Sequence, residues 1–477
     1  MADIERFEQA IEQYLAGEIH EDVFRVMRLN NGVYGQRQGG TNQMVRIKLP
    51  YGKMTFKQWK RIADISDEYS IGNLHLTTRQ DVQIHFVSLD RTPELWAQLE
   101  QDDITLREAC GNTVRNVTAS ITSGIDTQEP FDVTPYADAI FRYFLRNPIC
   151  QEMGRKIKMS FSNTEEDTSL AYLHDVGFIP KIQDGTRGFK VVVGGGLGAQ
   201  PMLAHTAYEF LAEDQVIPFI ESILRVFDRH GERNSRHKAR MKFLIQKIGF
   251  EEFMNLVNAE TKALKNHSFA IADASAWEVA EPTLTADIAA PETAEYQTWS
   301  DTNTFEQKQA GFHAVYVRIL NGNISSDTSR SLIEALKGYI GDDIRITINQ
   351  GLMLKFVPTA NLPYVFQVLN AHGLAAPGAN SIANITACPG TDTCNLAISD
   401  STNITSKLEQ VINEEFPALI HDSAMKIKIS GCMNACGQHS MASIGFHGSS
   451  LKAADKRVLP ALQVLIGGAT LGNGDGR

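Results

Sequence analysis

The chain repeats itself over a distance of about 270 residues. The segment LHLTTRQDVQIHFV (74–87) has the same strand–turn–strand pattern as IRITINQGLMLKFV (344–357), 270 positions later. Three shorter pairs recur in chain order at offsets of 270 to 272: QRQGG (36–40) with QKQAG (307–311), VRIKL (45–49) with VRIL (317–320), and KIKMS (156–160) with KIKIS (426–430). This period is far longer than that of a solenoid repeat, so the sequence predicts two homologous halves.

Each half is predicted to contain two α+β units. In TFKQWKRIADI (55–65), Thr55 and Gln58 have the spacing of a capping box, and apolar residues recur on one helical face. Two alternating strands follow, which gives half of a ferredoxin-like layer, and the two copies are expected to pair about a pseudo-twofold axis. A second mixed αβ unit, 155–201, is echoed from residue 425 onward.

The predicted organisation has five parts. They are a ferredoxin-like half-domain (1–125), an αβ domain (126–267), a linker rich in Ala, Thr, Glu and Pro (268–300), a second ferredoxin-like half-domain (301–375), and a second αβ domain (376–477). After Gly198 the first half continues through about sixty residues of helical pattern that the second half lacks. The second half therefore looks truncated: either the sequence is a fragment of a longer protein or these helices are dispensable.

Composition narrows the function classes. The 477 residues carry a formal net charge of −11, with 43% hydrophobic residues, which predicts a globular, multi-domain protein and argues against nucleic-acid or anionic-membrane partners. The N-terminal stretch is charged and amphipathic, unlike a signal peptide, and no long apolar run follows, so a cytoplasmic location is expected. In a reducing compartment six cysteines are not expected to form a disulfide framework.

Four of the six cysteines form two close pairs. Cys388-x5-Cys394 and Cys432-x3-Cys436 can supply a tetrathiolate site. Structural zinc usually has two-residue spacers, whereas a cubane cluster accepts wider ones, so the spacing favours iron–sulfur over zinc. Scattered buried thiols are the expectation for the other two, Cys110 and Cys150.

Together, the cysteine pattern, LTTRQDVQIHF, the duplication and GGGLG resemble the sirohaem-dependent nitrite/sulfite reductase family over essentially the whole chain. The resemblance implies that the four cysteines hold a [4Fe-4S] cluster and that Cys436 also bridges to sirohaem iron. It also implies that the enzyme reduces a small oxyanion by six electrons, because a cluster in contact with the haem can deliver electrons singly.

Sirohaem carries many carboxylates, so its pocket needs cations and amide donors. By motif alignment, Thr77, Arg79 and Gln83 are expected to reach the macrocycle, with His75 where some relatives carry arginine. RNSRHKARMK (233–242) offers a second carboxylate clamp, or else a solvated helix face. The family likeness also places the glycine loop against sirohaem, which makes Gly195 and Gly196 candidates, since GGGLG lacks the context of a dinucleotide fingerprint. The candidate clamp residues are Arg236, Lys238, Arg240 and Lys242.

Four cations match the family's anion-binding positions, and Asn434 matches a position near the haem. Two of them, Lys156 and Lys158, point to one face if they lie on a strand, and such cations can bind an oxyanion and deliver protons. The alternative is that these residues lie on an ordinary half-exposed strand. Arg318, Lys426 and Lys428 repeat the charges in the second half, so part of this basicity is inherited from the duplication. The four cations are Arg46, Arg115, Lys156 and Lys158.

The Lys-x-Lys pair resembles sulfite reductases, so sulfite is the favoured substrate and nitrite is the alternative. No flavin, nicotinamide or further cluster motif is present, so the electron donor is expected to be external, either ferredoxin or a flavoprotein. Two other classes remain open. One is a non-catalytic iron–sulfur electron-transfer or regulatory relative whose shortened second half does not retain sirohaem, and the other is a zinc-only structural protein.

Overall fold

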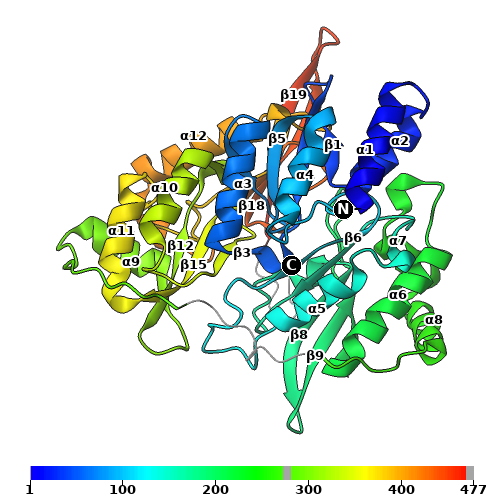
Figure 1. Cartoon of the computed structure of the whole chain (residues 1–477), viewed down its shortest axis with the longest axis horizontal. Coiled ribbons are helices and arrows are strands. Elements are labelled where there is room, and N and C mark those ends of the chain that lie inside the picture. The colour runs from blue at the N-terminus through cyan, green and yellow to red at the C-terminus, as the bar shows by residue number, and fades with distance from the viewer. Residues whose placement is uncertain (1, 272–280, 469–477) are drawn as a thin grey trace.

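The structure, a computed structural model, describes residues 2–271 and 281–468. Its ferredoxin-like part consists of two five-stranded sheets with their helices, and two further sheets carry the remaining strands (Figure 1). The first half contributes α1 (Ala2–Leu15), α2 (Glu21–Asn30), β1 (Val33–Gly35), β2 (Asn42–Ile47), β3 (Lys53–Met54), α3 (Phe56–Tyr69), β4 (Asn73–Leu76), β5 (Val82–Ser88) and α4 (Thr92–Glu100). The second half contributes α9 (Ala294–Asn303), β11 (Thr304–Glu306), β12 (Phe312–Val317), β13 (Asn323–Ser325), α10 (Ser326–Leu336), β14 (Ile344–Ile346), β15 (Leu352–Pro358) and α11 (Leu362–Ala371).

The capping box predicted for the first helix is confirmed. The Thr55 side chain accepts a hydrogen bond from the Gln58 backbone N–H at 3.2 Å, and the Gln58 side chain accepts one from the Thr55 N–H at 3.1 Å. Phe56, Trp59 and Ile62 on the predicted apolar face are buried. Local capping and periodicity therefore determined where α3 begins and which face it buries.

Each half lends one strand to the other. The two sheets have the orders β1-β2-β5-β4-β13 and β11-β12-β15-β14-β3. In the exchanged pairs Asn323 lies opposite His75, and Lys53 lies opposite Arg345. Since α3 and α10 also pack against each other, the halves interlock as two related copies, in agreement with the predicted duplication.

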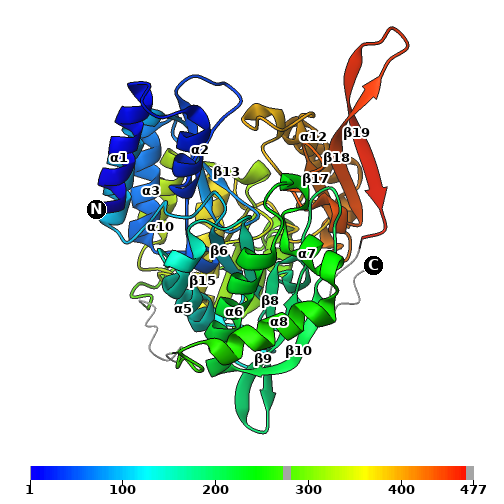
Figure 2. The same cartoon turned by 90° about the vertical axis from the view of Figure 1, so that its right-hand side faces the viewer.

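The two αβ units share one topology. The first contains β6 (Val114–Ala119), α5 (Thr134–Phe144), β7 (Ile157–Phe161), β8 (Val176–Gln183), β9 (Thr186–Val193), β10 (His205–Ala212), α6 (Val216–His230), α7 (Met241–Ile248) and α8 (Phe250–Ala263), and the second contains β16 (Thr386–Ala387), α12 (Ser401–Glu415), β17 (Ile427–Ser430), β18 (Ile444–Lys452) and β19 (Val458–Ile466). In both sheets three parallel strands are followed by an antiparallel one, β9 or β19. The β18–β19 hairpin extends well beyond the rest of the fold (Figure 2).

The main hydrophobic core draws on both halves. It contains Trp59 and Trp96 from the first half together with Trp299 and Leu332 from the second. A second core lies between the β6–β10 sheet and helices α5 to α8. The ferredoxin-like halves therefore share one interior, which fixes the positions of the two strand-turn-strand hairpins.

The structure corrects two details of the sequence interpretation. Arg46 lies opposite Gln83, but the residue opposite Met353, the counterpart of Gln83, is Tyr316. Lys48 is therefore the counterpart of Arg318. The sequence match of VRIKL with VRIL, at an offset of 272, was shifted by two residues, and a shift of two leaves each side chain on the same face of the strand.

The second correction concerns the predicted linker, 268–300. Residues 272–280 lie outside the described chain, and the last part of the linker is not irregular, because α9 begins at Ala294 and buries Trp299. Within the described ranges, no helix is both long and apolar enough to cross a membrane.

Candidate active site

Two glutamines fix the hairpins at the centre of the molecule. Gln80, in the left-handed conformation (φ 57°), donates to the Ala119 carbonyl at 2.9 Å and to the Ile346 carbonyl at 3.1 Å, and accepts from the Ala119 N–H at 3.0 Å. Its counterpart Gln350 (φ 65°) accepts from the Ala387 N–H at 2.9 Å and donates to the Leu76 carbonyl at 3.1 Å. Each glutamine thus joins its own αβ sheet to the opposite hairpin.

The four paired cysteines lie in loops that follow neighbouring parallel strands. Cys388 comes directly after β16, and Cys432 comes shortly after β17. Because parallel strands end at the same edge of a sheet, the fold brings these loops together. The Gly431 N–H donates to the Cys388 sulfur at 3.1 Å.

The other three paired cysteines lie near Cys436. Burial, and then the charge of Cys436, raises the pKa of Cys388 to about 12. Burial likewise raises the pKa of Cys394 and Cys432, with Cys436 again contributing to both. In the described part of the chain, no group of three or more His, Cys, Asp or Glu side chains is placed to hold a single metal ion.

The first-half hairpin and the loop after β1 contact the cysteine loops directly. The Thr78 hydroxyl donates to the Cys436 carbonyl at 2.9 Å. Arg37 donates from its backbone N–H to the Thr393 carbonyl at 2.9 Å and from its guanidinium to the Ala397 carbonyl at 3.1 Å. The first copy therefore approaches the cysteines of the second copy, although they are more than 300 residues apart in the sequence.

A row of polar side chains crosses the first ferredoxin-like sheet. Strand register places Arg46, Gln83, His75 and Asn323 side by side on β2, β5, β4 and β13. His75 is buried, and its Nδ1 lies 2.9 Å from the Asn323 Oδ1. Burial lowers the pKa of His75 to about 4, so the ring is neutral at physiological pH.

Arg79 points from the hairpin turn toward the first αβ sheet. Its guanidinium donates to the Thr118 hydroxyl at 3.2 Å and also contacts the Asn116 carbonyl and the His174 ring. The Thr77 hydroxyl accepts from the Arg79 and Asp81 N–H groups, both at 3.2 Å. Thr77 therefore shapes the turn that aims Arg79, and its predicted contact with a macrocycle stays a prediction.

Lys156 and Lys158 flank Ile157, the first residue of β7, and are half-buried. Burial, then the charges of Lys158, Arg115, Arg240 and Arg155, lower the pKa of Lys156 well below its usual value. Burial and neighbouring arginines, Arg79 first among them, do the same for Lys158. Among the described residues, neither ammonium group has a hydrogen-bond or carboxylate partner within the protein.

Arg115 and Arg240 complete this group, but each also has internal partners. Arg115 donates to the Ala109 carbonyl at 3.1 Å and to the Gly111 carbonyl at 2.8 Å. Arg240 forms a 2.8 Å ion pair with the buried Asp175. We call the six converging cations the basic cluster: Arg46, Arg79, Arg115, Lys156, Lys158 and Arg240.

The glycine loop lies against Arg240 and Lys242. A Cβ on Gly196 would come within 3.2 Å of the Arg240 guanidinium, and one on Gly195 would come within 2.3 Å of the Tyr172 carbonyl. Lys242 donates to the carbonyls of Gly196 and Leu197, at 3.3 and 3.0 Å, so it holds this loop. These glycines are needed for close packing, whatever else the loop binds.

Three other predicted residues are solvent-exposed. Arg236 and Lys238 lie on a short 3-10 turn at the surface, and the positive charge of Arg236 acts on Arg155. Asn434 is exposed between Cys432 and Cys436, and its side chain forms a hydrogen bond to Cys432. A ligating role for these three stays a prediction.

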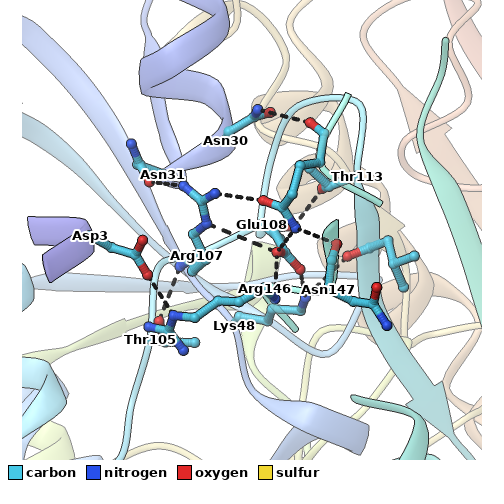
Figure 3. A network of polar contacts seen from close by, with 12 residues as sticks. Asp3, Asn30, Asn31, Lys48, Thr105, Arg107, Glu108, Thr113, Arg146 and Asn147 are labelled. Carbon is cyan, nitrogen blue, oxygen red and sulfur yellow. Dashed lines mark hydrogen bonds and ion pairs between the residues drawn. The ribbon is translucent and has the colours of Figure 1, made fainter. Parts of the chain in front are cut away.

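A buried polar network anchors the strand that carries Arg46 (Figure 3). Lys48 donates to the Val114 carbonyl at 3.1 Å, and its ammonium lies 3.7 Å from the carboxylate of the fully buried Glu108. Glu108 also accepts from the Arg146 N–H at 2.8 Å and from Gln151 at 2.7 Å. The sequence analysis did not find this network, because its members lie in segments that are far apart in the sequence and share no motif.

Two buried carboxylates beside the basic cluster were also missed. Asp81 and Asp175 are 1% and 0% exposed. Asp175 accepts from the Lys158 backbone N–H at 2.8 Å as well as from Arg240. Asp81 lies inside the TTRQD motif, so its position could have been noticed from the sequence, but its burial could not.

The chemistry of these residues fits both groups that the family implies. The four thiols would be deprotonated when they bind iron, and backbone N–H donors such as that of Gly431 would stabilise the thiolates. The basic cluster has six cations against the two nearby carboxylates, and its two lysines form no ion pair with a carboxylate among the described residues. Such an excess of buried positive charge suits a ligand that carries many carboxylates, together with an anionic substrate.

Comparison with known proteins agrees with this geometry. Residues 34–102 and 305–372 match the nitrite/sulfite reductase ferredoxin-like half domain, and residues 110–265 and 378–475 match the nitrite and sulphite reductase 4Fe-4S domain. The chain therefore belongs to the nitrite/sulfite reductase family.

Individual relatives span both substrate names. The chain is 28% identical to an assimilatory ferredoxin-dependent nitrite reductase of Haloferax mediterranei, over 92% of this chain and 76% of that protein. It is 26% identical to sulfite reductase [ferredoxin] 1 of Mycolicibacterium paratuberculosis, over 89% and 73%. The solved structure of Mycobacterium tuberculosis NirA protein superposes with a TM-score of 0.83 at 25% identity, covering all of this chain and 87% of that one.

Proposed function

We propose that the protein reduces a small oxyanion, most favourably sulfite to sulfide, by six electrons at sirohaem coupled to a [4Fe-4S] cluster. The observation that carries the proposal is that Lys156 and Lys158, which have no hydrogen-bond or carboxylate partner in the described ranges, converge with four arginines on the region next to Cys436. When bound, the two metal groups supply the electrons and the iron that the anion binds. Cys388, Cys394, Cys432 and Cys436 would hold the cluster.

The protein residues bind the anion and supply protons. Arg46 and Arg115 can donate charge-assisted hydrogen bonds to its oxygens, each contributing roughly 1.5–3 kcal/mol. The lowered pKa of Lys156 and Lys158 makes them better proton donors than ordinary lysines, and each cleaved S–O or N–O bond needs protons at the leaving oxygen. Arg79, Gln83, His75 and Arg240 are proposed to contact sirohaem.

Nitrite reduction to ammonia is the second candidate, because relatives with both names match the chain. Replacing Lys158 by asparagine keeps a hydrogen-bond donor but removes one charge. We expect the ratio of sulfite to nitrite turnover to fall in Lys158→Asn. An unchanged ratio would contradict the assignment of sulfite as the preferred substrate.

Ferredoxin is the proposed electron donor, with a flavoprotein as the rival, and the cytoplasm is the proposed location. The support for ferredoxin is that the matched relatives are named as ferredoxin-dependent. Reduction of the enzyme by ferredoxin, compared with reduction by a flavoprotein reductase at equal potential, distinguishes the two donors.

The experiment that tests the function is a visible absorption spectrum of the purified protein, with iron and acid-labile sulfide analysis, followed by turnover with sulfite and with nitrite. We expect sirohaem bands with about five irons and about four sulfides per chain. Iron and sulfide without these bands would indicate a non-catalytic cluster protein, and zinc in their place would overturn the proposal.

A further inference from the structure

Asp81 is a buried carboxylate placed among cations of the basic cluster. It is 1% exposed, and its Oδ2 lies 4.0 Å from the Arg46 guanidinium, which is longer than a good hydrogen bond. The facing charged groups are Arg46 from β2, Lys48 just after β2, Arg79 from the hairpin turn and Arg115 from β6. The Leu49 backbone N–H also donates to the Asp81 carboxylate.

The contact between Asp81 and Arg46 is incomplete on both sides. Asp81 Oδ1 and Arg46 Nε are both buried and have no hydrogen-bond partner among the described residues. Buried polar atoms are usually paired, so an unpaired carboxylate oxygen facing an unpaired guanidinium nitrogen calls for an explanation. By contrast, Asp175 forms a 2.8 Å ion pair with Arg240, so the other carboxylate beside the cluster has a structural partner.

The internal duplication shows that the fold does not need this carboxylate. The position 270 residues after Asp81 is Gly351, in the corresponding turn. The same hydrogen bond closes both turns. The Asp81 backbone N–H donates to the Thr77 hydroxyl at 3.2 Å, and the Gly351 backbone N–H donates to the Thr347 hydroxyl at 2.9 Å. The carboxylate therefore occurs in the copy that carries the basic cluster, while the turn forms without it in the other.

We propose that Asp81 is a specificity-determining residue of the oxyanion site: its negative charge offsets part of the basic cluster and weakens the binding of doubly charged oxyanions more than that of singly charged ones. This inference rests on the proposed function. Its physical basis is that a fixed charge repels an anion in proportion to the anion's own charge. Sulfite is doubly charged at pH 8, whereas nitrite carries one charge from pH 5 to pH 8.

The test compares the wild-type holoenzyme with Asp81→Asn, which keeps the shape and removes the charge. Dissociation constants are measured by titrating the visible spectrum with sulfite or nitrite, without turnover. At pH 8 we expect Asp81→Asn to bind sulfite about tenfold more tightly than wild type, and nitrite about threefold more tightly.

The pH dependence separates a charge effect from a structural one. Burial raises the pKa of Asp81 to about 6, so wild-type Asp81 is mostly neutral at pH 5. The nitrite affinities of wild type and Asp81→Asn should then converge at pH 5. Titration of Lys156 and Lys158 is common to both proteins and cancels in the ratio, and buried His75 and His85, with pKa values of about 4 and 3, stay neutral.

Asp343→Asn is the matched control, because Asp343 is also a buried aspartate facing an arginine, Arg345, but lies in the second half. It should leave both dissociation constants unchanged. An affinity ratio that is the same at pH 5 and pH 8, or an equal change in Asp343→Asn, would overturn the inference. If Asp81→Asn does not fold, Asp81→Gly takes its place, because it reproduces the residue of the second copy. A wild-type protein that binds neither anion would refute the proposed function and not this inference.

Discussion

The two copies of the Lys-x-Lys strand have the same sequence pattern and opposite environments. In the second copy, Lys428 donates to Asn349 at 3.0 Å, to Thr386 at 3.2 Å and to Gln438 at 3.0 Å. In the first copy, Lys158 has no such acceptors among the described residues and lies instead near Arg79, the counterpart of Asn349. The lysine of the second copy is therefore structural, because neutral oxygens surround it. The lysine of the first copy is available to a ligand, because cations surround it.

Inherited charge and functional charge can be told apart in the same way. Lys48 and its counterpart Arg318 are both buried, bond backbone carbonyls and face a glutamate, Glu108 or Glu409. Arg46 of the first copy belongs to the basic cluster, whereas its counterpart in the second copy is Tyr316. Duplicated positions that kept both their charge and their partners hold the fold, whereas the site is formed by positions at which the charge or the partners differ between the copies.

The largest expected effect comes from Cys436, the proposed cluster ligand that lies next to the basic cluster. Cys436→Ser removes a sulfur ligand of the proposed cluster that interacts electrostatically with Arg46 and Lys158. We expect loss of coupling between the cluster and sirohaem, seen as a changed visible spectrum, and a fall in turnover of more than a hundredfold, roughly 3 kcal/mol or more in activation free energy. Cys150→Ala, at a buried cysteine outside the site, is the control; an unaltered spectrum in Cys436→Ser would refute the bridging role.

The lysine comparison gives the second prediction. Lys158→Met should reduce oxyanion affinity and turnover by about 10²-fold while leaving the melting temperature unchanged or higher, because it removes a buried charge that is repelled by its neighbours. Lys428→Met should do the reverse, costing about 2–4 kcal/mol of unfolding free energy because three oxygens lose their donor, with turnover per folded molecule retained. Thermal unfolding and kinetics of the two variants, measured side by side, check this; equal effects on turnover would contradict it.

Two buried aspartates give a prediction on the pH dependence of stability. Burial alone would raise the pKa of Asp343, but Arg345, Lys355 and Lys53 outweigh it and lower that pKa well below its usual range. Asp343 therefore stabilises the fold above pH about 4, and this contribution is lost as the pH falls further. Asp81, with a pKa raised to about 6, has the opposite sign: the fold binds its proton more tightly than the unfolded chain does, so stability falls as the pH rises from about 4 to about 6.

At pH 7, Asp343→Asn should thus lower the unfolding free energy by about 2–4 kcal/mol, and Asp81→Asn should raise it by about 1–2 kcal/mol. Melting temperatures of both variants and wild type at pH 5 and pH 7 measure this. The gain in Asp81→Asn should shrink to about half at the lower pH, which lies midway between the pKa values of the unfolded and folded states. A loss of stability in Asp81→Asn at pH 7 would show that its ion pairs outweigh its burial.

The sequence predicted the parts of the molecule that local pattern controls. Capping and periodicity located α3, and the repeat predicted two related halves. The exchanged strands β3 and β13 were not predictable, since two or three residues carry no periodicity and their pairing depends on the other half. In the site, motif alignment found the cations, but Asp81 and Asp175 depend on burial, which becomes visible only when distant segments meet.

The smallest expected difference concerns the two glutamines. Gln80→Ala leaves the Ala119 N–H and two carbonyls without their partner, and Gln350→Ala leaves the Ala387 N–H and the Leu76 carbonyl unpaired. Each variant should lose about 2–3 kcal/mol of unfolding free energy, because unpaired buried backbone groups carry the full cost of desolvation. Since each glutamine bonds its own αβ sheet and the opposite hairpin in the same way, the losses should agree within about 1 kcal/mol, as measured by denaturant unfolding. If the two variants lose the same stability but only Gln80→Ala binds the anion more weakly, the functional difference between the copies lies in the turn that carries Arg79 and Asp81. A large difference in stability would instead mean that the copies have diverged in their structural contacts as well as in their site.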